Sequence, residues 1–372
     1  MKLSVIILNY KVPYFLQLCL QSVTRALLDI DSEIIVVDNA SEDSSVTMVQ
    51  QYFPDVKLIA NTTNSGFSKA NNQGVAQAKG EYICILNPDT VIPENCFSTL
   101  LEFSQNQIDM GAVGIRLIDG TGNYLPESKR NLPTIKVSAL KIIGNTSAYY
   151  ANQLAQDEVG KVSVLVGAFM FIKRQVYLDT GGFDEDYFMY GEDIDLSYTL
   201  HKKGYTNFYY GKLTAIHFKG ESSSKDKIYA QRFFGAMHIF HKKHFSKGLI
   251  SSWFMAFFLK ILSFSYSLPR SKKKIIPPIS NFYLVCEDVK SVDTMRLNLE
   301  KELKVISLAQ VRLALVSNSL IVFDLKSLST TAIINAMTLL KNNQNRFRIR
   351  PSNCNFIAGS DSSTDRGEIQ IW

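Results

Sequence analysis

Cysteine is scarce in this sequence and never occurs at a metal-binding spacing. The 372 residues contain five cysteines, which are widely separated and form no CxxC pair and no Cys/His ligand pattern. A zinc site is therefore not expected. Most of these cysteines lie in apolar runs, where a reduced cysteine behaves as a small hydrophobic residue, so we expect a reducing compartment such as the cytosol. The opening segment also lacks the long apolar core of a signal peptide, because Lys2 and Lys11 enclose too short a run.

Acidic residues are absent between Lys227 and Cys286, a stretch that contains ten Lys or Arg. We expect this stretch to face an anionic surface, either phosphate-bearing lipid or nucleic acid. Within it, residues 249–268 are mostly apolar, carry one charge and are long enough to span a membrane. Serines dilute this run, and four cations follow it at 270–274. An in-plane helix at a membrane surface fits at least as well as a span, and a core helix between two domains is the remaining alternative.

Short apolar runs alternate with amphipathic stretches along the first part of the chain. The apolar runs predict buried strands, and the amphipathic stretches predict helices. Strands are expected at 4–8, 33–37, 56–60 and 81–86, with helices from Pro13 and at 43–52 and 67–78. This alternation predicts an α/β fold with an open, mostly parallel sheet. A second alternation after residue 281, including a helix at 292–303, predicts a small second α/β domain.

Polar residues gather where four of the predicted strands end. Ligands of such sheets bind outside the carboxyl ends of the strands, although turn chemistry alone could explain any single loop. Asp38 is placed to accept hydrogen bonds from a ribose or a base, or else to cap the next helix. The four loops contain Asn9 and Tyr10, Asp38 and Asn39, residues 61–66, and Asn87 to Thr90.

The fourth loop, NPDT, places Asp89 after a buried strand. A diphosphate needs a divalent cation, and one or two carboxylates suffice to hold that cation while water and phosphate oxygens complete its shell. An Asx-Pro turn is the alternative explanation of the same residues. His217, in AIHFKGESS, is a candidate ligand of a metal or a phosphate, or else a structural histidine.

A third acidic site lies in FMYGEDIDL, where Glu192, Asp193 and Asp195 fall within four residues. Burying them requires a partner cation or a catalytic task, and a carboxylate is a suitable general base for an attacking hydroxyl. The alternative is that they complement the N-terminus of a helix predicted at 195–202. Nearby, residues 162–172 are expected to form a strand, and residues 119–160 an irregular loop that shapes a substrate site.

Six motifs, taken in order, resemble the family 2 glycosyltransferases, and within them the rhamnosyltransferase-like branch of bacterial polysaccharide assembly. The resemblance covers roughly residues 1–245. The motifs are VIILNY, VVDNASEDS, NTTNSGFSKANNQG, LNPDT, GAFMFIKRQVYLDTGGFDEDYFMYGEDIDLSYTLHKKGY and IHFKGESS.

The resemblance implies a Rossmann-like nucleotide-diphospho-sugar transferase (GT-A) fold and an inverting, single-displacement reaction assisted by Mg²⁺ or Mn²⁺. Asp193 would be the base, with Glu192 beside it on the acceptor side. Asp89 and His217 would lie at the metal, and Asn87 replaces the first acid of the family's Asp-x-Asp motif. Asp38 would contact the base or ribose, and the nucleotide pocket would be completed by Asn64, Gly66 and Asn71.

The resemblance also implies the partners and the place of action. We expect a nucleotide-diphospho-sugar donor, a glycan or lipid-linked glycan acceptor and an anionic membrane surface, at the cytoplasmic face of the inner membrane. The expected division is a transferase domain at 1–245, a membrane-associated helix and basic linker at 246–275, and a small α/β domain at 276–372. The tail resembles an extension of Bacteroidetes-type transferases, ending in IAGSDSS.

Three rival functions are weaker. A sugar-phosphate nucleotidyltransferase shares the fold but usually carries a glycine-rich loop near its first strand, and VIILNYKVP has no glycine. A non-catalytic nucleotide-sugar-binding scaffold predicts lost acids, yet Asp38, Asp89 and Asp193 are all present. No nucleic-acid partner is expected, because the basic stretch is interleaved with long apolar runs and not with isolated stacking aromatics.

Overall fold

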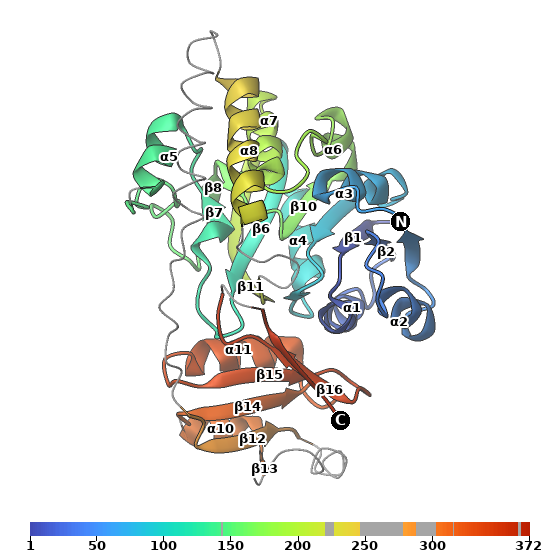
Figure 1. Ribbon diagram of the computed structural model, residues 1–372, viewed down its shortest axis with the longest axis vertical. Helices are drawn as coiled ribbons and strands as arrows, with labels where there is room; N and C mark the ends of the chain where they lie inside the picture. Colours follow the sequence, from blue (N-terminus) through green and yellow to red (C-terminus); the bar gives the residue numbers. More distant parts are fainter. Residues whose placement is uncertain (143, 220–226, 246–277, 288–302, 315, 364–365) are drawn as a thin grey trace.

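The computed structural model describes residues 1–142, 144–219, 227–245, 278–287, 303–314, 316–363 and 366–372. A nine-stranded sheet forms the centre of the first part of the chain, and a six-stranded sheet forms the centre of the last part (Figure 1). Helices pack on the faces of both sheets. The predicted α/β fold class is confirmed.

The first half of the large sheet is parallel, as predicted, and has the order β3-β2-β1-β4. β1 and β4 are buried along their whole length, which explains their continuous apolar sequences, whereas β3 at the edge is partly exposed. The chain crosses between them through three helices. The strands are β1 (Leu3–Asn9), β2 (Ser32–Asp38), β3 (Lys57–Ala60) and β4 (Tyr82–Leu86), and the helices are α1 (Pro13–Ala26), α2 (Ser45–Tyr52) and α3 (Phe67–Ala76).

The second half of the sheet is mixed. β10 runs antiparallel to both β4 and β6, and β11 pairs with β6 in parallel and with β5 and β8 antiparallel. The strands are β5 (Thr90–Val91), β6 (Met110–Ile118), β8 (Val159–Val162), β10 (Phe169–Lys173) and β11 (Thr206–His217). The helices are α4 (Cys96–Gln105), α6 (Arg174–Asp179), α7 (Glu192–Lys202) and α8 (Lys227–His244).

Two segments near the third acidic site differ from prediction. The single strand expected at 162–172 is three pieces, because β8 ends at Val162, β9 covers Val164–Leu165 and β10 begins at Phe169. The loop expected at 119–160 contains η1 (Pro126–Ser128), β7 (Lys129–Arg130) and α5 (Ile135–Ile142). β7 pairs with β9 in a separate two-stranded sheet.

The six-stranded sheet has the order β13-β12-β14-β15-β16-β17. Its strands are β12 (Asn281–Val285), β13 (Leu303–Ile306), β14 (Ser319–Asp324), β15 (Arg346–Arg350), β16 (Phe356–Gly359) and β17 (Glu368–Ile371), with helices α10 (Leu308–Ala314) and α11 (Thr330–Leu340). Of the helix predicted at 292–303, residues 292–302 lie outside the described residues, and Leu303 begins a strand instead.

The two sheets share one hydrophobic core. Phe15 of α1 and Phe218, just after β11, pack in the same cluster as Ile333 and Met337 of α11. The Glu94 carboxylate reinforces this contact by accepting hydrogen bonds from the first backbone N–H groups of α11, at 2.5 and 3.0 Å. Since Phe218 follows directly after His217, the C-terminal sheet supports one side of the predicted metal site.

None of the helices in the described ranges is long and apolar enough to cross a membrane. The membrane-associated helix predicted at 249–268 lies outside these ranges, as do the cations at 270–274.

Candidate active site

The loops after β1 and β2 form one buried polar cluster. Asn9 donates from Nδ2 to Asp38 Oδ1 at 2.7 Å and to Ser41 Oγ at 3.0 Å. The Ser41 hydroxyl and backbone N–H both donate to the Asp38 carboxylate, at 2.6 and 3.0 Å. Asp38 therefore does not cap the next helix, whose N-cap is Ser44, and these hydrogen bonds instead fix its side chain at the carboxyl end of β2. Asn9 Oδ1 is buried without a hydrogen-bond partner in the described part of the chain, so an acceptor remains for a ligand.

Asn39 connects this cluster to the loop after β3. Its backbone N–H donates to the Asn9 carbonyl at 2.9 Å, and its side-chain amide donates to Asn64 Oδ1 at 2.9 Å. It also reaches the Gly66 carbonyl, at 3.2 Å. The structure thus brings Asn9, Asp38, Asn39, Asn64 and Gly66 together, as the positions of the strand ends predict.

Of the three other predicted nucleotide-site residues, Asn87 lies beside His217 at the end of β4, and Asn71 and Tyr10 are less closely joined to this network. Asn71 is buried on α3 and donates to the Phe67 carbonyl at 3.0 Å, while its Oδ1 has no partner among the described residues. Tyr10 is half-buried, and Lys11 Nζ lies 5.3 Å from the centre of its ring.

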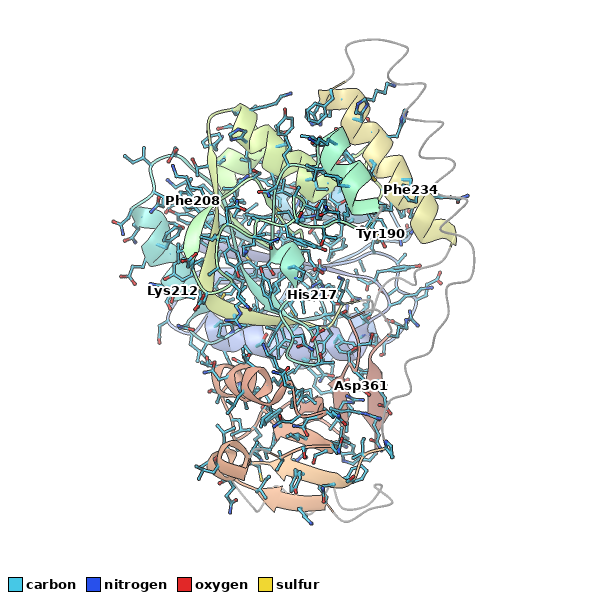
Figure 2. All side chains as sticks on the ribbon, turned by 90° about the vertical axis from the view of Figure 1, so that its left-hand side faces the viewer. Tyr190, Phe208, Lys212, His217, Phe234 and Asp361 are labelled. Atoms are coloured by element: carbon cyan, nitrogen blue, oxygen red, sulfur yellow. The ribbon has the colours of Figure 1, made fainter. Side chains whose placement is uncertain are left out.

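A second cluster forms where β4 ends. Asp89 Oδ1 lies 3.4 Å from His217 Nε2, and Asn87 Nδ2 lies 3.3 Å from the same nitrogen. The other Asp89 oxygen accepts a hydrogen bond from the Lys219 backbone at 3.1 Å. β11 delivers His217 because it ends antiparallel to β5, with His217 opposite Thr90. Figure 2 shows His217 in the middle of the molecule, close to the C-terminal sheet.

The third cluster lies at the N-terminus of α7. Gly191 has a left-handed backbone, with φ of +85°, and turns the chain into the helix. Asp193 Oδ2 then accepts hydrogen bonds from Arg130 Nη2 at 2.7 Å and from the Gly167 N–H at 3.0 Å. Oδ1 accepts one from the Ile194 N–H at 2.7 Å. An ionised carboxylate offers about four lone-pair positions, so one remains for an outside hydroxyl.

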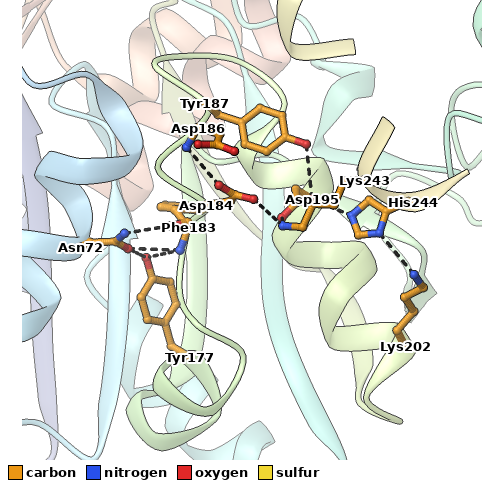
Figure 3. Close-up of polar contacts among 10 residues, drawn as sticks. All are labelled: Asn72, Tyr177, Phe183, Asp184, Asp186, Tyr187, Asp195, Lys202, Lys243 and His244. Atoms are coloured by element: carbon orange, nitrogen blue, oxygen red, sulfur yellow. Dashed lines mark hydrogen bonds and ion pairs between the residues drawn. The ribbon is translucent and has the colours of Figure 1, made fainter. Parts of the chain in front are cut away.

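Glu192 and Asp195, although adjacent to Asp193, have different surroundings. Burial, with the nearby Asp193 charge, raises the pKa of Glu192 to about 8, and Glu192 Oε2 has no hydrogen-bond partner among the described residues. Asp195 points to α8, where it pairs with Lys243 at 2.9 Å and His244 at 2.6 Å (Figure 3). Complementation of the helix dipole thus accounts for part of this acidic run, and Asp195 has a structural role.

A short stretch of backbone joins the second and third clusters. The Asn87 N–H donates to the Ala168 carbonyl at 3.0 Å, and the N–H of the preceding Gly167 donates to Asp193. The break between β9 and β10 is therefore explained by this contact, because it turns the Gly167 N–H towards the Asp193 carboxylate. A Cβ on Gly167 would lie 3.3 Å from Asp193 Cβ.

Sequence reasoning missed Arg130 and Ser41. Arg130 lies 63 positions from Asp193, and nothing in its local sequence distinguishes it from a surface cation. Ser41 had a signal, since Asp-x-x-Ser after a strand is typical of a turn that binds its own aspartate.

Residues 4–181 match the model of the family described as Glycosyl transferase family 2. These residues, just under half of the chain, carry the sequence pattern of the family 2 glycosyltransferases. The chain is 28% identical over 211 residues to the N-acetylglucosaminyl-diphospho-decaprenol L-rhamnosyltransferase of Mycobacterium tuberculosis, and the match covers 52% of the chain and 68% of that relative. It is 27% identical over 173 residues to the poly-beta-1,6-N-acetyl-D-glucosamine synthase of Staphylococcus epidermidis, covering 46% of the chain and 39% of that protein.

Among solved structures, the chain resembles a mannosyltransferase from Pyrobaculum calidifontis, determined with GDP-Man and Mn²⁺, with a TM-score of 0.47 and 16% identity. The match covers 72% of each chain. TarS of S. aureus matches with a TM-score of 0.46 and 17% identity, over 72% of this chain and 73% of that one.

The residues present fit a divalent metal ion that is held jointly with a diphosphate. Asp89 and His217 are close enough to share one ion, and no group of three or more His, Cys, Asp or Glu that could hold a metal by itself occurs in the described ranges. Two protein ligands suffice where phosphate oxygens and water complete the shell.

The raised pKa of Glu192 predicts a measurable pH dependence of stability. A carboxyl whose pKa is higher in the folded than in the unfolded state costs stability as the pH rises, starting near the unfolded value of 4.5 and ending above about 8. The full loss is about 5 kcal/mol, at 1.36 kcal/mol per pKa unit between 4.5 and about 8. We expect Glu192→Gln to remove this loss, which urea unfolding between pH 5 and 9 would measure. Parallel pH curves for the two proteins would contradict the prediction.

Proposed function

We propose that this transferase moves a sugar from a nucleotide-diphospho-sugar to a hydroxyl group of a lipid-linked glycan, with inversion at the anomeric carbon. The observation that carries the proposal is that two clusters at the carboxyl ends of β1, β2 and β4 are joined, through the Gly167–Ala168 backbone, to a third at the N-terminus of α7. The Asp38 cluster supplies acceptors for a base or ribose, Asp89 and His217 supply a cation site, and Asp193 supplies a base.

The order of these clusters matches the order of groups in the donor. The nucleoside would occupy the network of Asp38, Asn39 and Asn64, and the diphosphate would lie beside Asp89 and His217. The anomeric carbon would then face the Gly167–Ala168 turn, where Asp193 would take the proton of the attacking hydroxyl. When bound, the metal would offset the negative charge that develops on the departing diphosphate.

The chemistry of the two proposed metal ligands also affects which metal ion is preferred. Mg²⁺ prefers oxygen ligands, whereas an imidazole nitrogen suits the later transition metals better. Because His217 would supply one of only two protein ligands, we propose that Mn²⁺ supports a higher rate than Mg²⁺.

The acceptor and the place of action rest on the relatives and the composition. The mycobacterial relative is named for an acceptor that is a diphospho-decaprenol carrying N-acetylglucosamine. The basic, apolar stretch from Lys227 to Cys286 suits an anionic membrane surface. We therefore place the enzyme at the cytoplasmic face of the inner membrane of a bacterium.

A donor-hydrolysis screen tests the donor half of the proposal. Purified protein would be incubated with UDP-, GDP- and dTDP-sugars and with Mn²⁺, Mg²⁺ or EDTA, and nucleotide release would be measured. We expect release from one donor, loss in EDTA, and a decrease of at least about tenfold for Asp89→Ala, since its carboxylate is a direct ligand. Asp55→Ala, which removes an exposed acid outside the site, is the control and should behave like wild type.

The opposite result has a clear meaning. No release from any donor, together with no nucleotide-induced rise in melting temperature, would overturn the proposed reaction and favour the non-catalytic nucleotide-sugar-binding scaffold.

A further inference from the structure

A group of cationic and aromatic residues beside Asp193 is not used by the donor chemistry. Arg130 lies on β7, Lys141 on α5, and Tyr149 in the loop between α5 and β8. Lys141 Nζ lies 3.3 Å from the centre of the Tyr149 ring. Burial alone would raise the pKa of the Tyr149 hydroxyl, but the nearby positive charges of Arg130 and Lys141 lower it.

The positive charge of this group is only partly compensated. Arg130 is paired with Asp193, and Glu127, the other acid near Lys141, is paired with Lys219. Lys141 makes no ion pair with a carboxylate in the described part of the chain. One positive charge therefore remains near Arg130 and Tyr149, and a half-buried cation without a counter-ion is costly unless a ligand supplies one.

Arg130 also has a hydrogen-bond donor without a partner among the described residues. Arg130 is only 7% exposed, and its Nη2 is occupied by Asp193 and by the Leu165 carbonyl, yet its Nε–H has no hydrogen-bond partner among the described residues. Buried guanidinium donors are normally satisfied. An arginine, a lysine and a tyrosine hydroxyl in one group are also the donors that bind phosphate and carboxylate oxygens.

We propose that Arg130, Lys141 and the Tyr149 hydroxyl form the anion-binding subsite of the acceptor. An anionic group of the acceptor, either the diphosphate that links a glycan to its lipid or the carboxylate of an acidic sugar, binds there and positions the attacking hydroxyl at Asp193. Just beyond Arg130, Leu132 packs against the apolar cluster of Tyr187, Ala236 and Phe240 and gives this subsite an apolar neighbour. The inference rests on the proposed function and specifies the chemistry of its acceptor.

Steady-state kinetics with matched acceptors test the subsite. The acceptors would be undecyl-diphospho-N-acetylglucosamine, neutral undecyl N-acetylglucosaminide and undecyl glucuronide, used with the donor found by the hydrolysis screen. We expect Lys141→Met to raise the KM for an anionic acceptor by about 10- to 100-fold, as expected for a lost charge-assisted hydrogen bond. The KM for the neutral acceptor and for the donor should not change.

Two variants on the same helix serve as controls. Lys136→Met removes an exposed cation of α5 and should leave every constant unchanged, and Lys141→Arg should keep a low KM because it keeps the charge. An effect confined to the diphosphate acceptor identifies a lipid diphosphate, and an effect on the glucuronide identifies a sugar carboxylate.

Two results would overturn the subsite. One is an equal change in KM for charged and neutral acceptors, and the other is no change for any acceptor. Donor hydrolysis is measured in the same preparations, so failure of the proposed reaction itself would be recognised separately, by the absence of nucleotide release from the wild-type protein.

Discussion

Replacing Asp193 by asparagine is expected to lower the rate of sugar transfer by about 10²- to 10⁴-fold, the usual contribution of a positioned general base. Asparagine keeps the size of the side chain but cannot take a proton. The donor KM should change little, because Asp193 binds Arg130 and the Gly167 N–H, whereas the donor is assigned to the clusters of Asp38 and Asp89. Transfer to an acceptor must be measured, since slow hydrolysis of the donor by water does not require this base.

Asp193→Asn is also expected to destabilise the fold, so the experiment needs a control variant with a similar loss of stability. Asp193→Asn leaves the buried Arg130 without its counter-ion, and breaking a buried pair costs about 3–5 kcal/mol. Asp195→Asn is the matched control, because Asp195 is a buried acid on the same helix, paired with Lys243 and His244 (Figure 3). Both variants should lose stability, but only Asp193→Asn should lose transfer. Equal rates for the two variants would remove Asp193 from the mechanism.

The parallel half of the fold was predictable because its physical signal is local. β1, β2 and β4 are buried on both faces, so the sequence of each contains a continuous apolar run that is almost as long as the observed strand. The mixed half was not, since the pairing of β10 between β4 and β6 depends on contacts between segments that are far apart in the sequence. No local pattern records which strand lies beside which.

The same distinction separates the site residues that were found from those that were missed. Asn9, Asp38 and Asp89 follow strands directly, so the fold class alone places them at one edge of the sheet. Arg130 and Lys141 reach the site only through tertiary structure, from a segment that was expected to be irregular. The break at Gly167 was missed for a related reason, since it is explained by a hydrogen bond to Asp193 and not by the apolar pattern around it.

Gly66→Ala is expected to cost about 3 kcal/mol of unfolding free energy or more and to weaken donor binding at least tenfold. Gly66 has φ of 86° and ψ of 175°, a region essentially confined to glycine, where a side chain costs about 1–3 kcal/mol. Its new Cβ would also lie 2.6 Å from the Phe188 carbonyl oxygen, which already accepts a hydrogen bond from the Phe67 N–H. Because Gly66 and Asn64 contact Asn39, movement of this loop would disturb the nucleotide site.

Gly204→Ala separates backbone strain from this collision. Gly204 has a similar φ of +89°, but no atom lies within 4 Å of the position that its Cβ would take. It follows α7, on a different part of the fold from the nucleotide site, and its replacement should cost only about 1 kcal/mol and leave the donor KM unchanged. Urea unfolding and donor kinetics on both variants measure the difference. Equal losses of stability and of donor binding for Gly66→Ala and Gly204→Ala would contradict this prediction. The close contact between Gly66 and Phe188 would then not be what holds the nucleotide loop against the segment that leads into Asp193.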